Sequence, residues 1–330
     1  MMKQKLSLLI MLVIVLLLFS GCQNAGNHSV DDDYRKGTSA LTMRFLPNAP
    51  TSQIGEGEPA SIGLEIKNLG AANITRGMIR IAFDESVLTI DPTGATQGMP
   101  SYTFGDSKIF EGRSATNPKG DSEIILWPVE ANPLPLESAT RVADIVATAC
   151  YQYKNIMTSD VCIDVDPYDR LDTGEKKIRQ PCELTDLSPA TAGGPINVKT
   201  VKVAIEQDDS VLKPRFIFTV ENMGKGLVYK PGSEQFLCND RDIPTIDANV
   251  VGFWAKLSET ELVCDVEDPA DYIGRGTYLL HLKQNTARIV CELESFDTEG
   301  QIGNFKAPLT VELYYGYVQT ESTRTTVIRR

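Results

Sequence analysis

Apolar and polar residues alternate along the chain from Leu41 onward, with a period of two rather than the helical ~3.6. The clearest apolar positions of this pattern are Leu41, Met43 and Phe45, Ile62, Leu64 and Ile66, Ile79, Ile81 and Phe83, Val201, Val203 and Ile205, Phe216, Phe218 and Val220, and Val311, Leu313, Tyr315 and Tyr317. Successive side chains of a strand point to opposite faces of a sheet, so this alternation predicts half-buried β-strands. Many short strands separated by Gly, Pro, Asn and Asp predict an all-β chain built from β-sandwiches.

A short internal repeat divides this pattern into two similar parts. Ile66–Gly70 (Ile-Lys-Asn-Leu-Gly) matches Val220–Gly224 (Val-Glu-Asn-Met-Gly), and each follows an alternating strand. Asn and Gly tolerate positive φ, so Asn-x-Gly is a suitable turn at the end of a strand. The repeat predicts two copies of one sandwich plan, although strand-turn-strand patterns also recur by chance in all-β chains.

A second match supports the same duplication. Ala149–Tyr153 resembles Tyr314–Tyr317, 164 residues further on (153 to 317). We expect each segment to begin a hairpin that closes its domain, returning through Val161–Ile163 in the first copy and Thr326–Ile328 in the second.

The N-terminus has the three parts of a secretory signal: a basic start at Lys3 and Lys5, an apolar run from Leu6 to Phe19, and small residues before Cys22. Phe19-Ser20-Gly21-Cys22 resembles the lipobox of prokaryotic lipoproteins, and that resemblance implies a lipid on Cys22. Phe19 departs from the aliphatic residue that the family prefers at this place. An uncleaved anchor helix, or an ordinary signal peptide with a chance cysteine, are the alternatives.

Composition shifts predict the domain limits. Polar, acidic residues after Cys22 are typical of a flexible tether, and the charged and small residues after Asp164 are typical of a linker. The predicted parts are a signal peptide at 1–22, a tether at 23–40, a β-sandwich domain at 41–165, a linker at 166–195 and a second β-sandwich domain at 196–330.

Three segments resemble known families. The strand ending in Asn-x-Gly is similar to the Ig-like CARDB domains of prokaryotic surface proteins, and Ile79–Leu88 resembles an element of cohesin-like sandwiches. The six further cysteines and the ending Ala307–Tyr317 are similar to uncharacterised surface proteins of small-genome archaea. These resemblances imply two Ig-like β-sandwich domains in tandem after the N-terminal signal helix, and a place at the cell surface. They imply no activity.

The cysteines after Cys22 are even in number, which in an exported chain predicts disulfides. They are Cys150, Cys162, Cys182, Cys238, Cys264 and Cys291. We expect Cys150 to pair with Cys162 across a turn and Cys264 with Cys291 between strands, leaving Cys182 for Cys238. A metal site is the weaker alternative, since no Cys-x-x-Cys occurs.

Charge and residue types narrow the function. The net charge of −12 argues against nucleic-acid binding, which needs clustered Lys and Arg. The two histidines are His28, in the tether, and His281, in a strand-like segment, and no motif of a nucleophilic, zinc or phosphate-binding site occurs. We therefore predict no catalytic activity and no cofactor, with a glycan-active enzyme using paired carboxylates as the remote alternative.

Two further kinds of site are weaker predictions. Asp164, Asp166 and Asp169 form an acidic cluster that is typical of a solvated linker and only weakly suggests calcium. Asn27 and Asn73 each fit the N-glycosylation pattern, which matters only in a host that glycosylates.

These features together predict a lipid-anchored protein on the extracytoplasmic face of the membrane that binds an unidentified protein or glycan, or acts as a scaffold. The loop from Asp91 to Gly120 and the tyrosines at Tyr314, Tyr315 and Tyr317 are the candidate contact regions. The alternative is a structural subunit of an envelope assembly, in which strands pair between copies.

Overall fold

The structure, a computed structural model, describes residues 34–90, 101–105, 108–164, 185–208, 211–233, 238–239, 244–265, 269–271, 276–293 and 304–330. Residues Tyr34–Arg330 form one compact unit. The described residues are mostly strand, with the short 3-10 helix η2 (Thr245–Asp247), so the predicted all-β fold is confirmed. No helix within these residues is long and apolar enough to cross a membrane.

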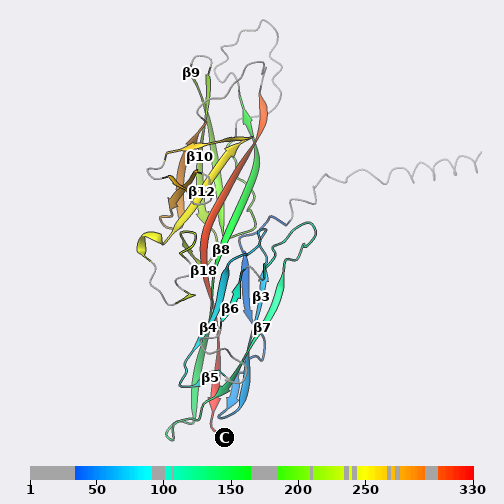
Figure 1. The fold of residues 1–330 in the computed structure, drawn as a ribbon, viewed down its shortest axis with the longest axis vertical. Helices are drawn as coiled ribbons and strands as arrows, with labels where there is room; N and C mark the ends of the chain where they lie inside the picture. The colour runs from blue at the N-terminus through cyan, green and yellow to red at the C-terminus, as the bar shows by residue number, and fades with distance from the viewer. Residues whose placement is uncertain are drawn as a thin grey trace, which may run out of the picture. The chain divides into compact units, whose positions relative to one another are not determined.

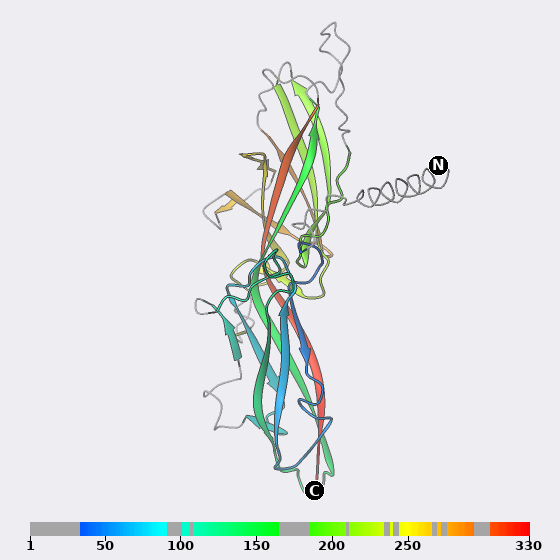
Figure 2. The ribbon, with the colours of Figure 1, turned by 90° about the vertical axis from the view of Figure 1, so that its right-hand side faces the viewer.

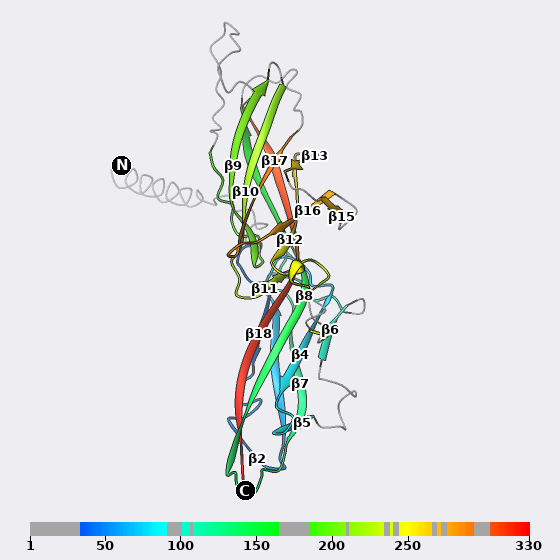
Figure 3. The same cartoon turned by 90° about the vertical axis from the view of Figure 1, so that its left-hand side faces the viewer.

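Two four-stranded antiparallel sheets have the same plan. The first has the order β1-β3-β7-β5 and consists of β1 (Leu41–Phe45), β3 (Pro59–Asn68), β7 (Ser122–Ala131) and β5 (Leu88–Ile90). The second has the order β9-β10-β17-β14 and consists of β9 (Ile196–Asp208), β10 (Val211–Asn222), β17 (Thr286–Glu292) and β14 (Val263–Cys264). Figure 3 shows β9, β10 and β17 side by side.

A third, ten-stranded sheet runs through both halves of the fold in the order β15-β16-β12-β18-β8-β4-β6. Its strands are β15 (Pro269–Asp271), β16 (Gly276–His281), β12 (Val250–Leu257), β18 (Phe305–Ile328), β8 (Thr140–Ile163), β4 (Gly77–Phe83) and β6 (Ser101–Phe104), with β2 (Gln53–Gly55), β11 (Leu227–Tyr229) and β13 (Thr260–Glu261) attached beside them. We call β1-β3-β7-β5 with β4 and β6 the first half, and β9-β10-β17-β14 with β12 and β16 the second half.

The strands β8 and β18 are 24 residues each and pair antiparallel along their whole length. Figures 1 and 2 show them as a green and a red ribbon that run together through both halves. β8 pairs with β4 only up to Tyr151, and its later residues lie beside the part of β18 that pairs with β12. Each long strand therefore begins inside its own half and ends as an outer strand of the other half.

The strand order in each half matches an Ig-type sandwich, in which strands ABED face strands CFG. In the first half β1-β3-β7-β5 occupies the ABED positions, and β4 and the start of β8 occupy C and F. The G position is taken by the end of β18, which belongs to the other half. The second half receives the end of β8 in the same way, so the two halves exchange their last strands.

This exchange shows that the two predicted hairpins are wrong. Ala149–Tyr153 does not turn back through Val161–Ile163, because both segments lie on the continuous strand β8. Thr326–Ile328 likewise continues β18. The domain limits at 165 and 196 stay a prediction, but the residues of β8 after Tyr153 pair within the second half.

The repeated Asn-x-Gly turns occupy equivalent places at the ends of β3 and β10. The Asn68 amide donates to the carbonyl of Ala72 at 2.9 Å and accepts from the N–H of Gly70 at 3.1 Å. Asn222 makes the same two bonds, to the carbonyl four residues later and the N–H two residues later, each at 3.0 Å. Sequence repeat and structural repeat therefore coincide.

Candidate functional site

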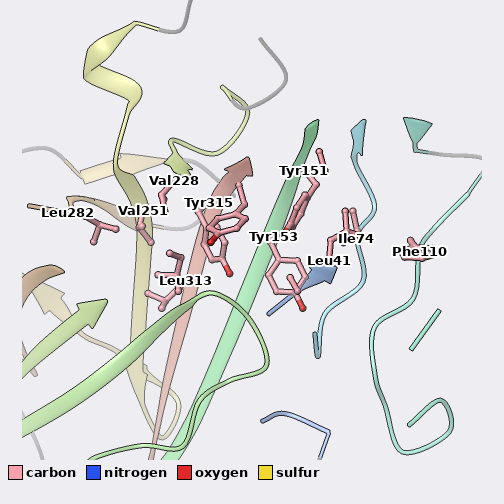
Figure 4. Close-up of a cluster of buried hydrophobic side chains, with 14 of the residues drawn as sticks. Leu41, Ile74, Phe110, Tyr151, Tyr153, Val228, Val251, Leu282, Leu313 and Tyr315 are labelled. Carbon is pink, nitrogen blue, oxygen red and sulfur yellow. The ribbon is translucent and has the colours of Figure 1, made fainter. Parts of the chain in front are cut away.

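Four buried tyrosines lie where β8 and β18 cross from one half into the other. This tyrosine cluster consists of Tyr151 and Tyr153 on β8 and Tyr315 and Tyr317 on β18, with exposed fractions from 0% to 4%. The ring centroids of neighbouring tyrosines are 5.9 Å to 6.2 Å apart, and each tyrosine contacts two others of the cluster. Figure 4 shows Tyr151, Tyr153 and Tyr315 among the surrounding aliphatic side chains. Pairs of aromatic rings at such distances add to the stability gained from burial alone.

The hydroxyls at two corners of the cluster bind the repeated turns. Tyr153 accepts a hydrogen bond from the N–H of Ala72 at 2.9 Å and donates to the carbonyl of Gly193 at 3.0 Å. Tyr317 accepts from the N–H of Gly226, the equivalent turn residue, at 2.7 Å. Each long strand is thereby hydrogen-bonded to the repeated turn of its own half, β8 to the turn after β3 and β18 to the turn after β10.

Two amide side chains, each two residues after a cluster tyrosine, bind the same strands to the opposite half. Asn155, on β8, donates to the carbonyl of Ile196 at 2.6 Å, and Gln319, on β18, donates to the carbonyl of Leu41 at 2.8 Å. Leu41 and Ile196 are equivalent, since each pairs with the Asn of its Asn-x-Gly turn. Each exchanged strand is thus hydrogen-bonded to the first strand of the half that receives it.

The pseudosymmetry fails at one hydroxyl. Tyr315 donates to the side-chain oxygen of Asn155 at 2.8 Å, whereas its counterpart Tyr151 makes no side-chain hydrogen bond among the described residues and has only the backbone of Leu41 beside its hydroxyl. Burial raises the pKa of all four tyrosines of the cluster, most strongly for Tyr151 and Tyr315. An unpaired buried hydroxyl costs free energy, so the two positions should respond differently to loss of the hydroxyl.

We expect Tyr315→Phe to lower the free energy of unfolding by about 1–3 kcal/mol, because the buried oxygen of Asn155 loses its donor. The matched variant Tyr151→Phe removes a hydroxyl that makes no side-chain hydrogen bond among the described residues, and it should change stability by less than about 0.5 kcal/mol, or raise it. Urea unfolding followed by tryptophan fluorescence measures both. Equal losses for the two variants would contradict the assigned bonds.

Two open cavities flank this crossing. Cavity 1 has a volume of about 490 Å³ and is lined by the first turn, by β8 from Gln152 to Ile156, and by Tyr314. Cavity 2 has a volume of about 410 Å³ and is lined by the start of β1, the second turn and β18 from Tyr317 to Glu321. Each cavity is lined by residues of one repeated turn and by the long strand that is bonded to that turn, but the start of β1 lines cavity 2 whereas the described lining of cavity 1 includes no residue of β9.

The disulfides differ from the predicted pairing. Cys264 bonds Cys291 as predicted, and the two face each other on β14 and β17. Cys150 bonds Cys238 instead of Cys162, because Cys150 and Cys162 lie far apart on one extended strand. The predicted pair of Cys182 with Cys238 is wrong, because Cys238 bonds Cys150. Cys162 is also disulfide-bonded, and its partner lies outside the described residues.

The Cys150–Cys238 disulfide joins β8 within the first half to the segment that follows β11 in the second half. Both sulfurs are buried, packed with Val318 and beside Met78 and Tyr229. The Arg80 guanidinium donates to the carbonyl of Cys238 at 3.2 Å. These contacts hold the two halves together at a second place besides the exchanged strands. Disulfides indicate an oxidising, extracytoplasmic location.

The remaining predicted site residues do not converge. Asn73 is exposed in the first turn, where its side-chain oxygen accepts from Gly112, and His281 is exposed on β16. Asp164 is the last described residue after β8. Of the predicted tyrosines, Tyr315 is buried and Tyr314 is half-buried on the opposite face. Cys22, Asn27, Asp166, Asp169, Cys182 and residues 91–100 and 106–107 lie outside the described residues. The predicted loop from Asp91 to Gly120 is wrong at Ser101–Phe104, because these residues form strand β6 and pair with β4.

Sequence reasoning did not find Asn155 and Gln319, although a signal was present. Each amide residue follows a cluster tyrosine by four positions, Asn155 after Tyr151 and Gln319 after Tyr315. Extending the second internal match by two residues, from Tyr153 and Tyr317, would have paired them. Across the stretches that the structure describes, no group of three or more His, Cys, Asp and Glu side chains is arranged to hold a metal ion.

Comparisons with known proteins leave the family open. No family model and no curated protein matches the chain. Similar solved structures include the secreted serine protease VesC from Vibrio cholerae (8% identity, TM-score 0.19, 86% of this chain and 51% of that chain), Spo0M from Bacillus subtilis (8%, 0.14, 55% and 80%) and the Enterococcus faecalis surface protein ACE (8%, 0.17, 89% and 96%). The chain thus spans about half the length of VesC. At these TM-scores the likenesses carry no argument about function, and the resemblance to CARDB domains stays a prediction.

Proposed function

We propose that the protein is an exported, membrane-anchored binding or scaffold protein whose two interlocked β-sandwich halves present a rigid surface to the outside of the cell. The observation that carries the proposal is the exchange of β8 and β18 between the halves, together with the Cys150–Cys238 bond across them. Because the exchanged strands and the disulfide join the two halves at two places, the loops and strand edges of the halves keep constant positions. Binding sites on loops and edges need such support.

The membrane anchor rests on the N-terminal sequence and the oxidised cysteines. The basic, apolar and small-residue parts that end at Cys22 are those of a lipoprotein signal. The disulfides agree with export, since the thiols of cytoplasmic proteins are mostly kept reduced. A lipid on Cys22 would attach the chain to the outer face of the membrane 12 residues before Tyr34, where the described residues begin (34 − 22 = 12).

We expect Cys22→Ser to abolish lipid attachment. In a bacterial expression host that processes lipoproteins, the wild-type chain should incorporate radiolabelled palmitate and sediment with membranes, and Cys22→Ser should do neither. The matched control Ser20→Ala keeps a small residue at the same signal and should behave as wild type. Palmitate incorporation by Cys22→Ser, or unlabelled wild-type protein, would contradict the anchor.

A further inference from the structure

The segments that lead into β1 and β9 begin alike at the repeated turns. In each half the residue before the first strand accepts a hydrogen bond at 2.8 Å from the residue after the turn asparagine, and these accepting residues are Ala40 and Pro195. Two positions earlier, Thr38 therefore corresponds to Gly193. The two halves can thus be compared residue by residue at this place.

One oxygen satisfies two donors at the first turn, and the second turn lacks its counterpart. The carbonyl of Gly193 accepts from the hydroxyl of Tyr153 at 3.0 Å and from the N–H of Ala71 at 2.9 Å. The equivalent donors are the hydroxyl of Tyr317 and the N–H of Lys225. Among the described residues neither of them donates a hydrogen bond, although Tyr317 is only 2% exposed. Buried donors are nearly always paired, so these two are suited to bind one further oxygen atom.

Thr38 does not supply this oxygen, because hydrogen bonds hold its segment to another part of the chain. Gly37 donates its N–H to the hydroxyl of Thr191 at 2.8 Å, and its carbonyl accepts from the N–H of Gly194 at 3.2 Å. Both partners belong to the segment before β9, so Gly37 is held beside that segment rather than at the second turn. Cavity 2, of about 410 Å³, lies beside the two donors, since its lining includes Thr38 and Lys225 together with Tyr317.

The second turn also carries a positive charge where the first turn has an alanine. The side chain of Lys225 is exposed and makes no ion pair within the part of the chain that the structure describes. The other charged residue of the described lining is Glu321, four residues after Tyr317 and about 13 Å from it along β18. Hydrogen bonds to an ionised acceptor are about twice as strong as neutral ones, so a cation beside two donors favours a carboxylate over a carbonyl.

We propose that cavity 2 binds the carboxylate of a small ligand. One carboxylate oxygen accepts from the Tyr317 hydroxyl and the Lys225 N–H, as the Gly193 carbonyl does at the first turn, and the Lys225 ammonium neutralises the charge. The apolar part of the ligand lies against lining residues such as Leu227 and Val318. A free acid and the C-terminus of a peptide share this chemistry, and the test separates them. This inference rests on the proposed binding function and gives it a ligand class and a place.

The test is a nuclear magnetic resonance titration of the full chain in detergent, with its lysines labelled with nitrogen-15. The probes are butyrate, a free acid, and N-acetylglycylglycine, which ends in a peptide carboxylate. Lys225→Arg removes one amide signal and so identifies that of Lys225. We expect at least one probe to move the Lys225 amide proton downfield until saturation, because a new hydrogen bond deshields it, while butyramide and N-acetylglycylglycine amide leave it in place. A response to butyrate means that a free acid is sufficient, and a response to N-acetylglycylglycine alone means a peptide C-terminus.

Calorimetric titration of variants tests the individual groups. Tyr317→Phe removes one donor and should raise the Kd of the bound probe at least tenfold, whereas the matched Tyr153→Phe removes a hydroxyl whose acceptor lies in the chain and should leave the Kd unchanged. Lys225→Gln removes the charge of an exposed side chain, should fold as wild type and should raise the Kd at least threefold.

Three results would overturn the proposal: no movement of the Lys225 amide with either probe, equal responses to an acid and its amide, or an unchanged Kd in Lys225→Gln and in a Tyr317→Phe variant with the wild-type thermal midpoint. None of them bears on the membrane anchor, because palmitate labelling of Cys22 tests it without either probe.

Discussion

Replacing Cys150 and Cys238 together by Ala should lower the free energy of unfolding by about 4.5 kcal/mol. The bond closes a segment with a sequence separation of 88, and in the chain-entropy model a loop of that length gives a loss of about this size. Both sulfurs are buried between the halves, so the variant also loses packing against Val318. Guanidinium unfolding of the oxidised protein measures the change.

The matched control for this variant is the pair Cys264→Ala and Cys291→Ala. That disulfide spans a separation of only 27 and lies between neighbouring strands within one half, so the expected loss is smaller, about 3.5 kcal/mol. A loss below about 1 kcal/mol for the Cys150 and Cys238 variant would show that this bond does not hold the halves together.

Alkaline pH should unfold the protein steeply, because burial raises the pKa of all four cluster tyrosines. In the unfolded chain a tyrosine ionises near pH ~10, whereas in the folded chain it stays neutral to higher pH. The stabilising contribution is therefore complete below about pH 10 and is lost as the pH rises toward the folded pKa. Each tyrosine adds a slope of up to about 1.4 kcal/mol per pH unit, so four give about 5 kcal/mol per unit.

Urea unfolding at a series of pH values measures this slope, and the ultraviolet difference spectrum of tyrosinate follows ionisation directly. Tyr151→Phe removes one titrating group and should reduce the cluster's slope by about a quarter. Tyrosines of the cluster that ionise near pH ~10 in the folded protein, or a slope that Tyr151→Phe leaves unchanged, would show that the crossing is open to solvent.

The sequence was sufficient for the strands themselves. Alternating positions such as Ile62, Leu64 and Ile66 are buried on β3, and Phe216, Phe218 and Val220 are buried on β10. Period-two alternation reports which face of a strand is buried, and that information is local. The Asn-x-Gly turns could be recognised for the same reason, since Asn68 and Asn222 bond residues only two and four positions away.

The local alternation of apolar and polar residues did not predict which strands pair with one another. A hairpin from Tyr153 to Val161 and a continuous strand show the same local alternation, and the choice between them depends on a partner more than 150 residues away, such as Tyr315 opposite Tyr153. One cue was present, since residues 149–163 contain neither Gly nor Pro to make a turn. The disulfide of Cys150 was mispredicted because its pairing depended on that hairpin.

The exchange of strands is tested most directly by mapping the disulfides of the native protein with trypsin under non-reducing conditions. Trypsin cuts after Lys154, which separates Cys150 from Cys162. On one continuous strand these two cysteines are about 40 Å apart and cannot bond. We predict that the peptide containing Cys150 is linked to the peptide containing Cys238. A link between Cys150 and Cys162 would mean that the strand folds back as a hairpin, and would contradict the interlocked halves.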